Sequence, residues 1–199
     1  MQLAQEILHY WFGEADDPGQ QISKQSSLWW GKSLAVDKEI KTRFGAALDL
    51  LYSDELEGWK HTPADWLALI ILADQFSRNI FRDDARAFAQ DALALTLCKE
   101  GIELGVDLDL NPLQRVFFYL PLEHSESLKD QQRCVELMEG LVKIAPAGCR
   151  EEFEGFHGYA RAHHAVIEKF GRFPHRNAIL GRELTAAEKE YLAQPGAGF

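Results

Sequence analysis

The sequence predicts an all-α fold, and three kinds of observation lead to this expectation. Apolar residues recur at helical spacing along most of the chain, as Leu3, Ile7 and Tyr10 do near the start. Capping residues mark where helices begin, and glycines mark where they end. Strand signals are scarce. We therefore expect roughly eight or nine helices, joined as antiparallel hairpins in a tetratricopeptide-like superhelical bundle.

The first two helices are expected from periodicity alone. The apolar spacing that begins at Leu3 stops at Gly13, so the first helix should end there. The polar stretch 14–25, which contains Pro18 and Gly19, is expected to be a loop. Apolar residues then recur at helical spacing over 36–51, which predicts a second helix with a charged outer face.

Later helix starts are predicted by capping chemistry. A side chain that accepts a hydrogen bond from the first turn, followed by proline or by an acidic or amide residue three positions on, is typical of a helix start. The expected caps are Thr62, Asn111, Ser127 and Thr185. The expected helix ends are Gly101 or Gly105, Pro146 with Gly148, and Gly171.

Composition limits the class of protein. A chain of 199 residues that is 46% hydrophobic fits one soluble globular domain over 1–199. A formal net charge of -10 argues against binding to nucleic acid or to anionic membranes. Three widely spaced cysteines, no basic leader and no run of about 18 apolar residues predict a cytoplasmic protein that does not span a membrane.

The helix that begins at Thr62 has an unusual change of character. Its first part, WLALIILA, is apolar on every side, which is typical of a helix buried at the centre of a fold. It then becomes polar, with Asp74, Arg78 and Arg82 four residues apart on one face and Asn79 beside them. These charges either form an internal ion pair where the helix reaches the surface or make the polar floor of a cleft.

The helix that begins at Asn111 contains Pro121, which removes a backbone hydrogen bond and favours a kink. The sequence Glu123-His124-Ser125-Glu126 follows directly. A kink at this point would aim a carboxylate and an imidazole at a site, although proline kinks also serve packing alone. Both interpretations remain open.

Metal binding is the obvious hypothesis for a chain with many His and Glu residues. Glu6 with His9 and Glu154 with His157 match the Glu-x-x-His spacing of di-iron bundles. The order of these pairs along the chain does not fit such a bundle, and no four-ligand zinc spacing occurs. Phosphate-binding and dinucleotide-binding glycine motifs are also missing, so the sequence predicts neither a metal nor a cofactor.

The stretch FGRFPHRN at 170–177 concentrates positive charge and aromatic rings in an acidic chain. Gly171 should end the preceding helix in a left-handed conformation, and Pro174 should hold the chain extended before a short helix over 175–181. Residues 169–182 contain four basic side chains and no acid, which favours an anion as neighbour. That anion is either internal, Asp74 or Glu123, or an external phosphate or carboxylate.

Three motifs, DQFSRN at 74–79, PLEHSE at 121–126 and FGRFPHRN with LGR at 170–182, resemble the bacterial family named domain of unknown function 924. The resemblance extends over essentially the whole chain. It implies an all-α fold grouped with tetratricopeptide-like superhelices, and it brings no settled activity. Members of that family often have Pro where this chain has Ser77, which concerns local helix geometry.

The three motifs lead to one main hypothesis and two alternatives. The main hypothesis is a polar pocket for a small anionic ligand, with His124 or His175 as general acid or base if the protein is an enzyme. The expected ligand-binding residues are Asp74, Arg78, Asn79, Glu123, Arg172 and Arg176. The alternatives are a non-catalytic module that binds a peptide in its groove, and a buried polar network that only fixes the helices.

Overall fold

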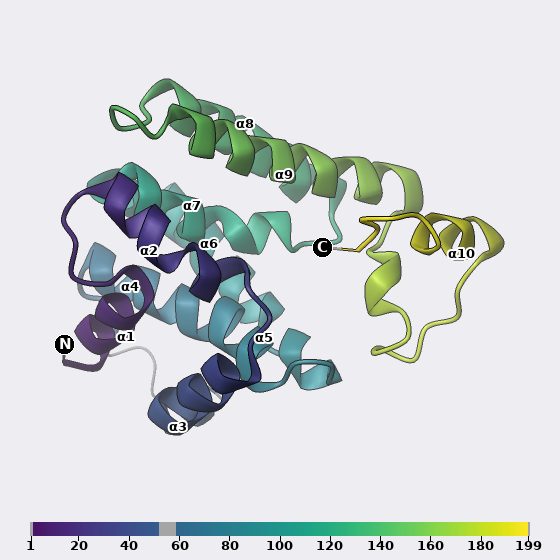
Figure 1. Cartoon of the computed structure of the whole chain (residues 1–199), viewed down its shortest axis with the longest axis horizontal. Helices are drawn as coiled ribbons and strands as arrows, with labels where there is room; N and C mark the ends of the chain where they lie inside the picture. Colours follow the sequence, from purple (N-terminus) through teal and green to yellow (C-terminus); the bar gives the residue numbers. More distant parts are fainter. Residues whose placement is uncertain (1, 52–58, 199) are drawn as a thin grey trace.

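The computed structural model describes residues 2–51 and 59–198, and these residues form helices and no strand (Figure 1). The expected all-α fold is therefore confirmed. The helices are α1 (Gln2–Phe12), α2 (Pro18–Trp30), α3 (Leu34–Leu50), α4 (Pro63–Ile70), α5 (Ser77–Ile80), α6 (Asp91–Glu103), α7 (Pro112–Glu123), α8 (Leu128–Lys143), α9 (Arg150–Phe170) and α10 (Ala186–Leu192).

The centre of the fold is α4 and the π-helical segment Ile71–Phe76 that continues it into α5. Every residue from Trp66 to Phe76 is buried, as the apolar sequence of this helix predicts. Helices α1, α3, α6 and α7 pack against this central element. Burying a helix on all sides removes its whole apolar surface from water, and the core forms around it.

The C-terminal half adds a long antiparallel pair, α8 and α9, which lies along α7 (Figure 1). After α9 the chain turns at Gly171, passes through α10 and returns toward the middle of the molecule. A second, smaller apolar cluster of Val166, Ile167 and Phe173 holds the start of this C-terminal segment, residues 171–198. A tetratricopeptide-like superhelix and a single domain stay predictions.

Local capping chemistry is confirmed at all four predicted helix starts. Thr62, Asn111 and Thr185 form complete capping boxes, and the Ser127 side chain accepts from the backbone N–H of Asp130. These contacts satisfy backbone donors that the first turn of a helix leaves free. Gly171 has φ 68°, the left-handed conformation expected at a helix end.

The expectation of a loop over 14–25 is wrong, because most of this stretch belongs to α2. The Asp17 side chain accepts from the backbone N–H of Gln20 at 2.9 Å, and Pro18 occupies the first helical position. Proline is favoured there, since that residue needs no N–H donor. The same proline was taken as a loop signal because α2 is polar over its first turns.

Of the two expected ends of α6, the structure selects Gly105, which follows the helix with φ 73°, while Gly101 lies inside α6 against Phe118. One smaller expectation differs from the structure. The short helix expected over 175–181 is a 3-10 turn, Pro174–Arg176, followed by further turns. The limits of so short an element depend on which neighbours pack against it, and local composition does not show them.

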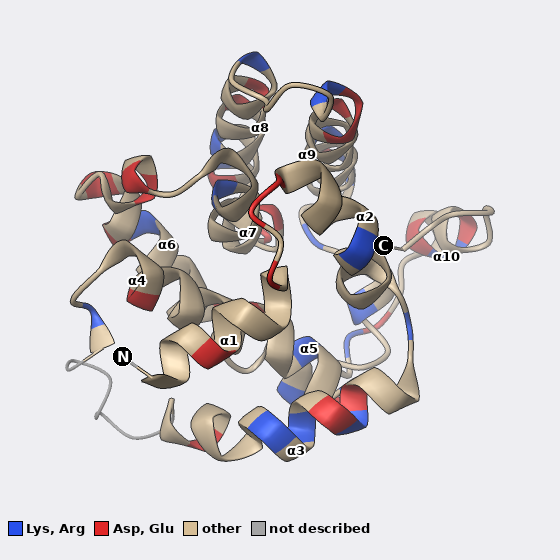
Figure 2. Cartoon of the chain, turned by 60° about the vertical axis from the view of Figure 1, so that its left-hand side comes forward, with Lys and Arg blue, Asp and Glu red and all other residues tan. Residues whose placement is uncertain are grey.

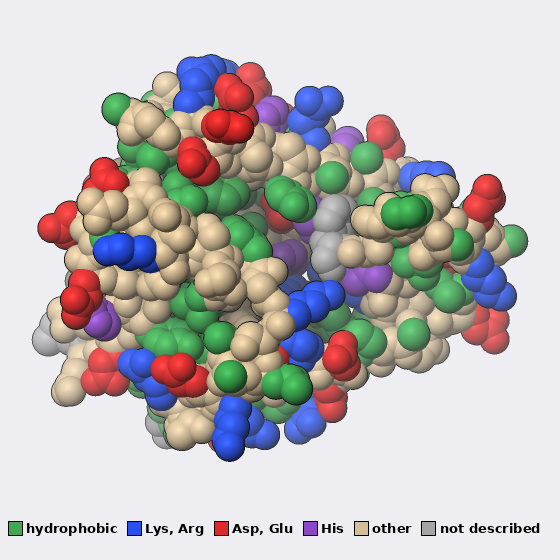
Figure 3. All heavy atoms as spheres, viewed as in Figure 1, with side chains coloured by type: hydrophobic (Ala, Val, Ile, Leu, Met, Phe, Trp, Pro, Cys, Tyr) green, Lys and Arg blue, Asp and Glu red, His purple; other side chains and the backbone are tan. Residues whose placement is uncertain are grey.

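The surface carries both signs of charge. Figure 2 shows acidic residues in the loop that joins α1 to α2 and on α10, and one basic residue, Arg78, on α5. Figure 3 shows a hollow between the main body and the C-terminal segment, with histidine and basic side chains along its edge. Among the described residues, no helix combines the length and apolarity that crossing a bilayer requires.

Candidate functional site

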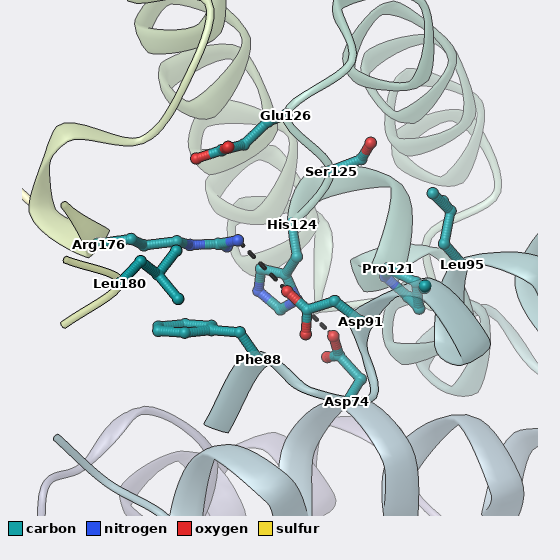
Figure 4. A pocket seen from close by; sticks show the side chains of 11 residues that line it. Asp74, Phe88, Asp91, Leu95, Pro121, His124, Ser125, Glu126, Arg176 and Leu180 are labelled. Carbon is teal, nitrogen blue, oxygen red and sulfur yellow. Dashed lines mark hydrogen bonds and ion pairs between the residues drawn. The ribbon is translucent and has the colours of Figure 1, made fainter. Parts of the chain in front are cut away.

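All three sequence motifs contribute to one cavity of about 330 Å³, which lies between α6, the end of α7 and the C-terminal segment (Figure 4). Residues 80–169 separate the first motif from the last, and the fold brings the two together. The cavity is lined by Asp74, Phe88, Asp91, Ala92, Leu95, Pro121, His124, Ser125, Glu126, Arg176 and Leu180.

Asp74 reaches the cavity from the π-helical segment, where backbone hydrogen bonds span one residue more than in an α-helix. Its carboxylate is only 1% exposed, so it needs partners. Arg78 supplies one of them: its Nη1 lies 3.1 Å from Asp74 Oδ1 and donates to the Asp74 carbonyl oxygen at 2.7 Å. The Gln75 amide also donates to the carboxylate. π-Helical turns are frequent at functional sites.

His124 is the second partner of Asp74. Its Nδ1 lies 2.7 Å from Asp74 Oδ1, and the ionised carboxylate can only accept, so Nδ1 carries the proton. His124 follows the last turn of α7, where its backbone N–H donates to the Leu120 carbonyl at 2.9 Å. Its other ring nitrogen, Nε2, has no hydrogen-bond partner among the described residues and remains available to a ligand in the cavity.

The protonation states of this pair follow from burial and from Arg78. Burial alone raises the pKa of Asp74, but the charge of Arg78 and the hydrogen bond from His124 outweigh it and hold the pKa below its ordinary value. Burial, helped by the Arg78 charge, lowers the pKa of His124, although Asp74 opposes this change. His124 is therefore neutral at pH 7, and its Nε2 can accept a proton.

Arg176 forms another part of the cavity wall and is only 6% exposed. Its guanidinium lies between two phenylalanine rings, 4.8 Å from the centre of Phe88 and 4.5 Å from the centre of Phe173. Its hydrogen bond goes to Asp91, from Nη1 at 3.3 Å, while Nε has no acceptor within the described part of the chain. Burial lowers the pKa of Arg176 to about 10, so it is still a cation at pH 7.

The other two arginines of the C-terminal segment, Arg172 and Arg182, form ion pairs with carboxylates of the protein itself. Arg172, a predicted ligand-binding residue, does not line the cavity, because Nε and Nη2 bind Glu188 at 2.6 and 2.8 Å. Arg182 binds both oxygens of Glu126, at 2.7 and 2.9 Å. Asp74 and Glu123 were the expected internal anions for the basic residues of 169–182. The ion pairs of the described arginines in this stretch go to Glu188, Asp91 and Glu126 instead.

Glu123, a predicted ligand-binding residue, does not line the cavity and is buried, 5% exposed. No arginine or lysine among the described residues pairs with it; the nearest basic group is His163, whose Nδ1 is 3.4 Å from Oε1. Burial, and secondarily the Asp74 charge, raises the pKa of Glu123 to about 8. Burial also lowers the pKa of His163 to about 3. The carboxyl group is therefore mostly protonated at pH 7, beside a neutral imidazole.

Two further predicted site residues, Arg78 and Asn79, do not line the cavity. Arg78 stands behind it, where it joins Asp74 to Asp91. Asn79 points elsewhere: it donates to Asp37 at 2.9 Å, and Arg82 binds the same carboxylate. Asp74, Arg78 and Arg82 therefore do not share one face, since the helix ends at Ile80 and Arg82 lies in the turn beyond it.

His175, the second predicted acid or base, does not line the cavity. Its ring packs against Phe173, with 5.5 Å between the ring centres, and the chain passes close to it again at Gly198. Burial, helped by the Arg176 charge, lowers the pKa of His175 to about 4. A neutral imidazole among aromatic and backbone neighbours is suited to packing more than to proton transfer.

Sequence reasoning missed several residues that shape the site. Phe88 and Asp91 belong to the segment 85–91, and nothing in its sequence links it to the three motifs. Glu126 belongs to the PLEHSE motif, and its position after His124 was the available signal. The described residues hold no group of three or more His, Cys, Asp or Glu side chains arranged to bind a metal ion.

The geometry defines an all-helical protein with a small polar cavity that joins an Asp–His pair to a buried arginine. Comparison with known sequences then gives the family. Residues 7–196 match the family described as bacterial protein of unknown function (DUF924), and the chain belongs to that family. A search of curated proteins finds no match.

A solved structure with a similar fold supports this assignment. The protein of unknown function ATU0120 from Agrobacterium tumefaciens is similar to this chain, with 36% sequence identity and a TM-score of 0.81. The alignment covers 96% of this chain and 97% of that one. The similarity therefore extends over the elements that build the cavity. It concerns fold and family, and function has to be argued from the site.

Proposed function

We propose that the cavity binds a small anionic molecule, with Arg176 as its cationic contact and His124 as a general base. The observation that carries the proposal is the state of Arg176: a buried guanidinium with five N–H donors, one hydrogen bond to Asp91 and an Nε without an acceptor among the described residues. A buried cation with unused donors is costly unless a partner binds it. A carboxylate or phosphate in the cavity would supply the missing acceptors.

The Asp74–His124 pair would allow this site to transfer a proton. Asp74 fixes the imidazole with Nδ1 protonated, so Nε2 is the acceptor that faces the cavity. It can take a proton from a water molecule or from a hydroxyl group of the ligand, and Asp74 then stabilises the imidazolium that forms. Arg78 holds the Asp74 carboxylate in place from behind. Peptide binding stays an untested alternative.

The first test is anion binding by calorimetry, with acetate and inorganic phosphate as probes. We expect millimolar anion to bind the wild-type protein and Arg176→Met to weaken binding at least about tenfold, because the cation that neutralises the anion is lost. Arg133→Met is the matched control, since Arg133 is half exposed on α8 and lies outside the cavity. Equal binding by the wild type and Arg176→Met would refute the proposal.

The second test addresses His124 by ¹⁵N nuclear magnetic resonance of labelled histidine. We expect the neutral ring to carry its proton on Nδ1 at pH 7, because Asp74 accepts from that atom. Bound acetate should shift the Nε2 resonance in the wild type and have no effect in Arg176→Met. A neutral ring with its proton on Nε2 would exclude His124 as the base.

A further inference from the structure

The two ends of the cavity differ in chemistry. In Figure 4, Arg176 and Leu180 lie on one side of His124, and Leu95 and Pro121 lie on the other. The Arg176 end is cationic and aromatic, since Phe88 covers one face of the guanidinium. At the other end Leu95 and Pro121 are apolar, and the Ser125 hydroxyl above them donates to Asp130 at 2.9 Å. A ligand that contacts both ends therefore needs an anionic group and an apolar group.

Helix α6 sets the spacing between the two ends. Asp91, which accepts the hydrogen bond from Arg176, is the first residue of α6. Leu95 lies four residues further along, about 6 Å at the rise of an α-helix, and Ala92 stands between them. This distance corresponds to a few bonded carbon atoms. His124 lies near the middle of the cavity in Figure 4, so the central atoms of such a ligand would pass its ring.

The charges of the wall favour a monoanion. Three carboxylates, those of Asp74, Asp91 and Glu126, line the same cavity as Arg176. Each of them repels an anion, and the repulsion is larger for a dianion such as phosphate than for a carboxylate. The rings of Phe88 and Phe173 cover the faces of the guanidinium, which leaves its edge for hydrogen bonds. A planar carboxylate fits that edge.

We propose that the ligand of this cavity is a short-chain aliphatic carboxylate, with its carboxylate at Arg176 and its alkyl chain against Leu95 and Pro121. This proposal rests on the proposed function, because it assumes that Arg176 receives an anion. A volume of about 330 Å³ is at the small end of ligand pockets, which suits a molecule of this size. Leu95 and Pro121 would then select for the alkyl chain of the ligand, and Arg176 would select for its negative charge.

The test compares acetate, butanoate and hexanoate by calorimetry. Affinity should rise by about fourfold for each methylene that leaves water, so hexanoate should bind the wild type well over tenfold more tightly than acetate. Hexanol should bind at least about tenfold more weakly than hexanoate, because it lacks the charge. Inorganic phosphate should bind more weakly than butanoate.

Two substitutions on α6 separate the apolar end from the rest of the helix. Leu95→Asn should reduce the gain in affinity from acetate to hexanoate by about tenfold, because the alkyl chain loses its apolar contact. Leu93→Asn is the matched control: Leu93 is half-buried like Leu95 and lies on the same helix, but it does not line the cavity. Its alkanoate series should match that of the wild type.

The outcomes distinguish this inference from the proposed function. If neither acetate nor hexanoate binds in a manner that depends on Arg176, the proposed function itself is wrong. Two results would leave anion binding intact but refute the assignment of the alkyl chain to Leu95 and Pro121. One is equal affinity for acetate and hexanoate, both bound through Arg176. The other is a Leu95→Asn variant whose affinity still rises with alkyl length as much as that of the wild type. A larger loss for Leu93→Asn than for Leu95→Asn would also overturn the inference.

Discussion

The C-terminal segment presents two kinds of arginine within a few residues of one another. Arg172 and Arg182 each bind both oxygens of one carboxylate, Glu188 and Glu126 respectively. Arg176 lies between them in the sequence and is more deeply buried, yet its ion pair with Asp91 is a single contact at 3.3 Å. Arg172 and Arg182 thus form bidentate pairs and Arg176 does not, although Nε of Arg182, like that of Arg176, has no acceptor among the described residues.

The two glutamates of the PLEHSE motif differ in the same way. Burial raises the pKa of Glu126, but hydrogen bonds from Arg182 and from the backbone N–H of Phe173 outweigh it, and the net pKa is low. Glu123, three residues earlier, has no arginine or lysine partner among the described residues; its neighbours are His163 and the Cys134 thiol, and its pKa is raised to about 8. The bidentate Arg182–Glu126 pair anchors the C-terminal segment to the body, and the Arg172–Glu188 pair holds that segment together internally. Arg176, with its single contact, lines the cavity instead. This contrast separates scaffold from site.

The largest expected effect is on Arg78, which binds the two carboxylates Asp74 and Asp91. Arg78→Met should lower the free energy of unfolding by about 3–5 kcal/mol, because it leaves the buried Asp74 without its main counter-charge. The same substitution at Arg176 should cost about 1 kcal/mol or less, since no buried carboxylate depends on it alone. Urea denaturation of both variants at pH 7 measures the difference.

Equal losses of unfolding free energy in Arg78→Met and Arg176→Met would contradict the distinction between an arginine that neutralises a buried carboxylate and one with a single weak contact. Arg133→Met, on the exposed face of α8, serves as the control for loss of one positive charge and should change stability by less than about 0.5 kcal/mol.

An effect of intermediate size is expected from Glu123 at alkaline pH. The folded protein holds the Glu123 proton up to about pH 8, whereas the unfolded chain loses it near the ordinary value of 4.5. This contribution to stability is therefore complete below about pH 4.5 and declines as pH rises to 8. Glu123→Gln has no group to ionise at this position and so avoids the loss of stability at high pH. At pH 9 the variant should therefore be more stable than the wild type by about 1–3 kcal/mol.

At pH 5 the two proteins should differ little, because the wild-type carboxyl group is then protonated as well. Urea denaturation at pH 5, 7 and 9 gives the comparison. Wild-type stability that changes with pH in parallel with that of Glu123→Gln would mean that Glu123 is ionised in the folded protein.

The smallest effect is expected at Arg182, whose pair with Glu126 is partly open to solvent, with side chains 24% and 29% exposed. Arg182→Met should cost about 1 kcal/mol, because solvent screens such a pair. Acetate affinity should fall by less than about fivefold, because Glu126 without Arg182 repels the anion more strongly while the Arg176 guanidinium is untouched. A loss of acetate binding as large as that in Arg176→Met would make the anchor and the cavity one functional unit.

Helices were the part of this protein that the sequence determined most directly. The caps at Thr62, Asn111 and Thr185 act within four residues of chain, so they are visible in the sequence and are found in the structure. The prediction of helices was wrong where one residue type is common in two kinds of structure. Pro18 begins α2 after the Asp17 cap, although proline and a polar composition also describe a loop.

Pairing of charges was decided by the tertiary structure alone. The sequence placed acids and arginines in three motifs, and the motifs meet, but Asp74 bonds to Arg78 and His124 while Arg176 bonds to Asp91. Composition cannot choose among such partners, because every acid attracts every arginine and the choice depends on distance and burial. Those quantities follow from helix packing over separations of up to 85 residues along the chain. The cavity, and the Nε donor of Arg176 that has no acceptor among the described residues, therefore follow from the tertiary structure alone.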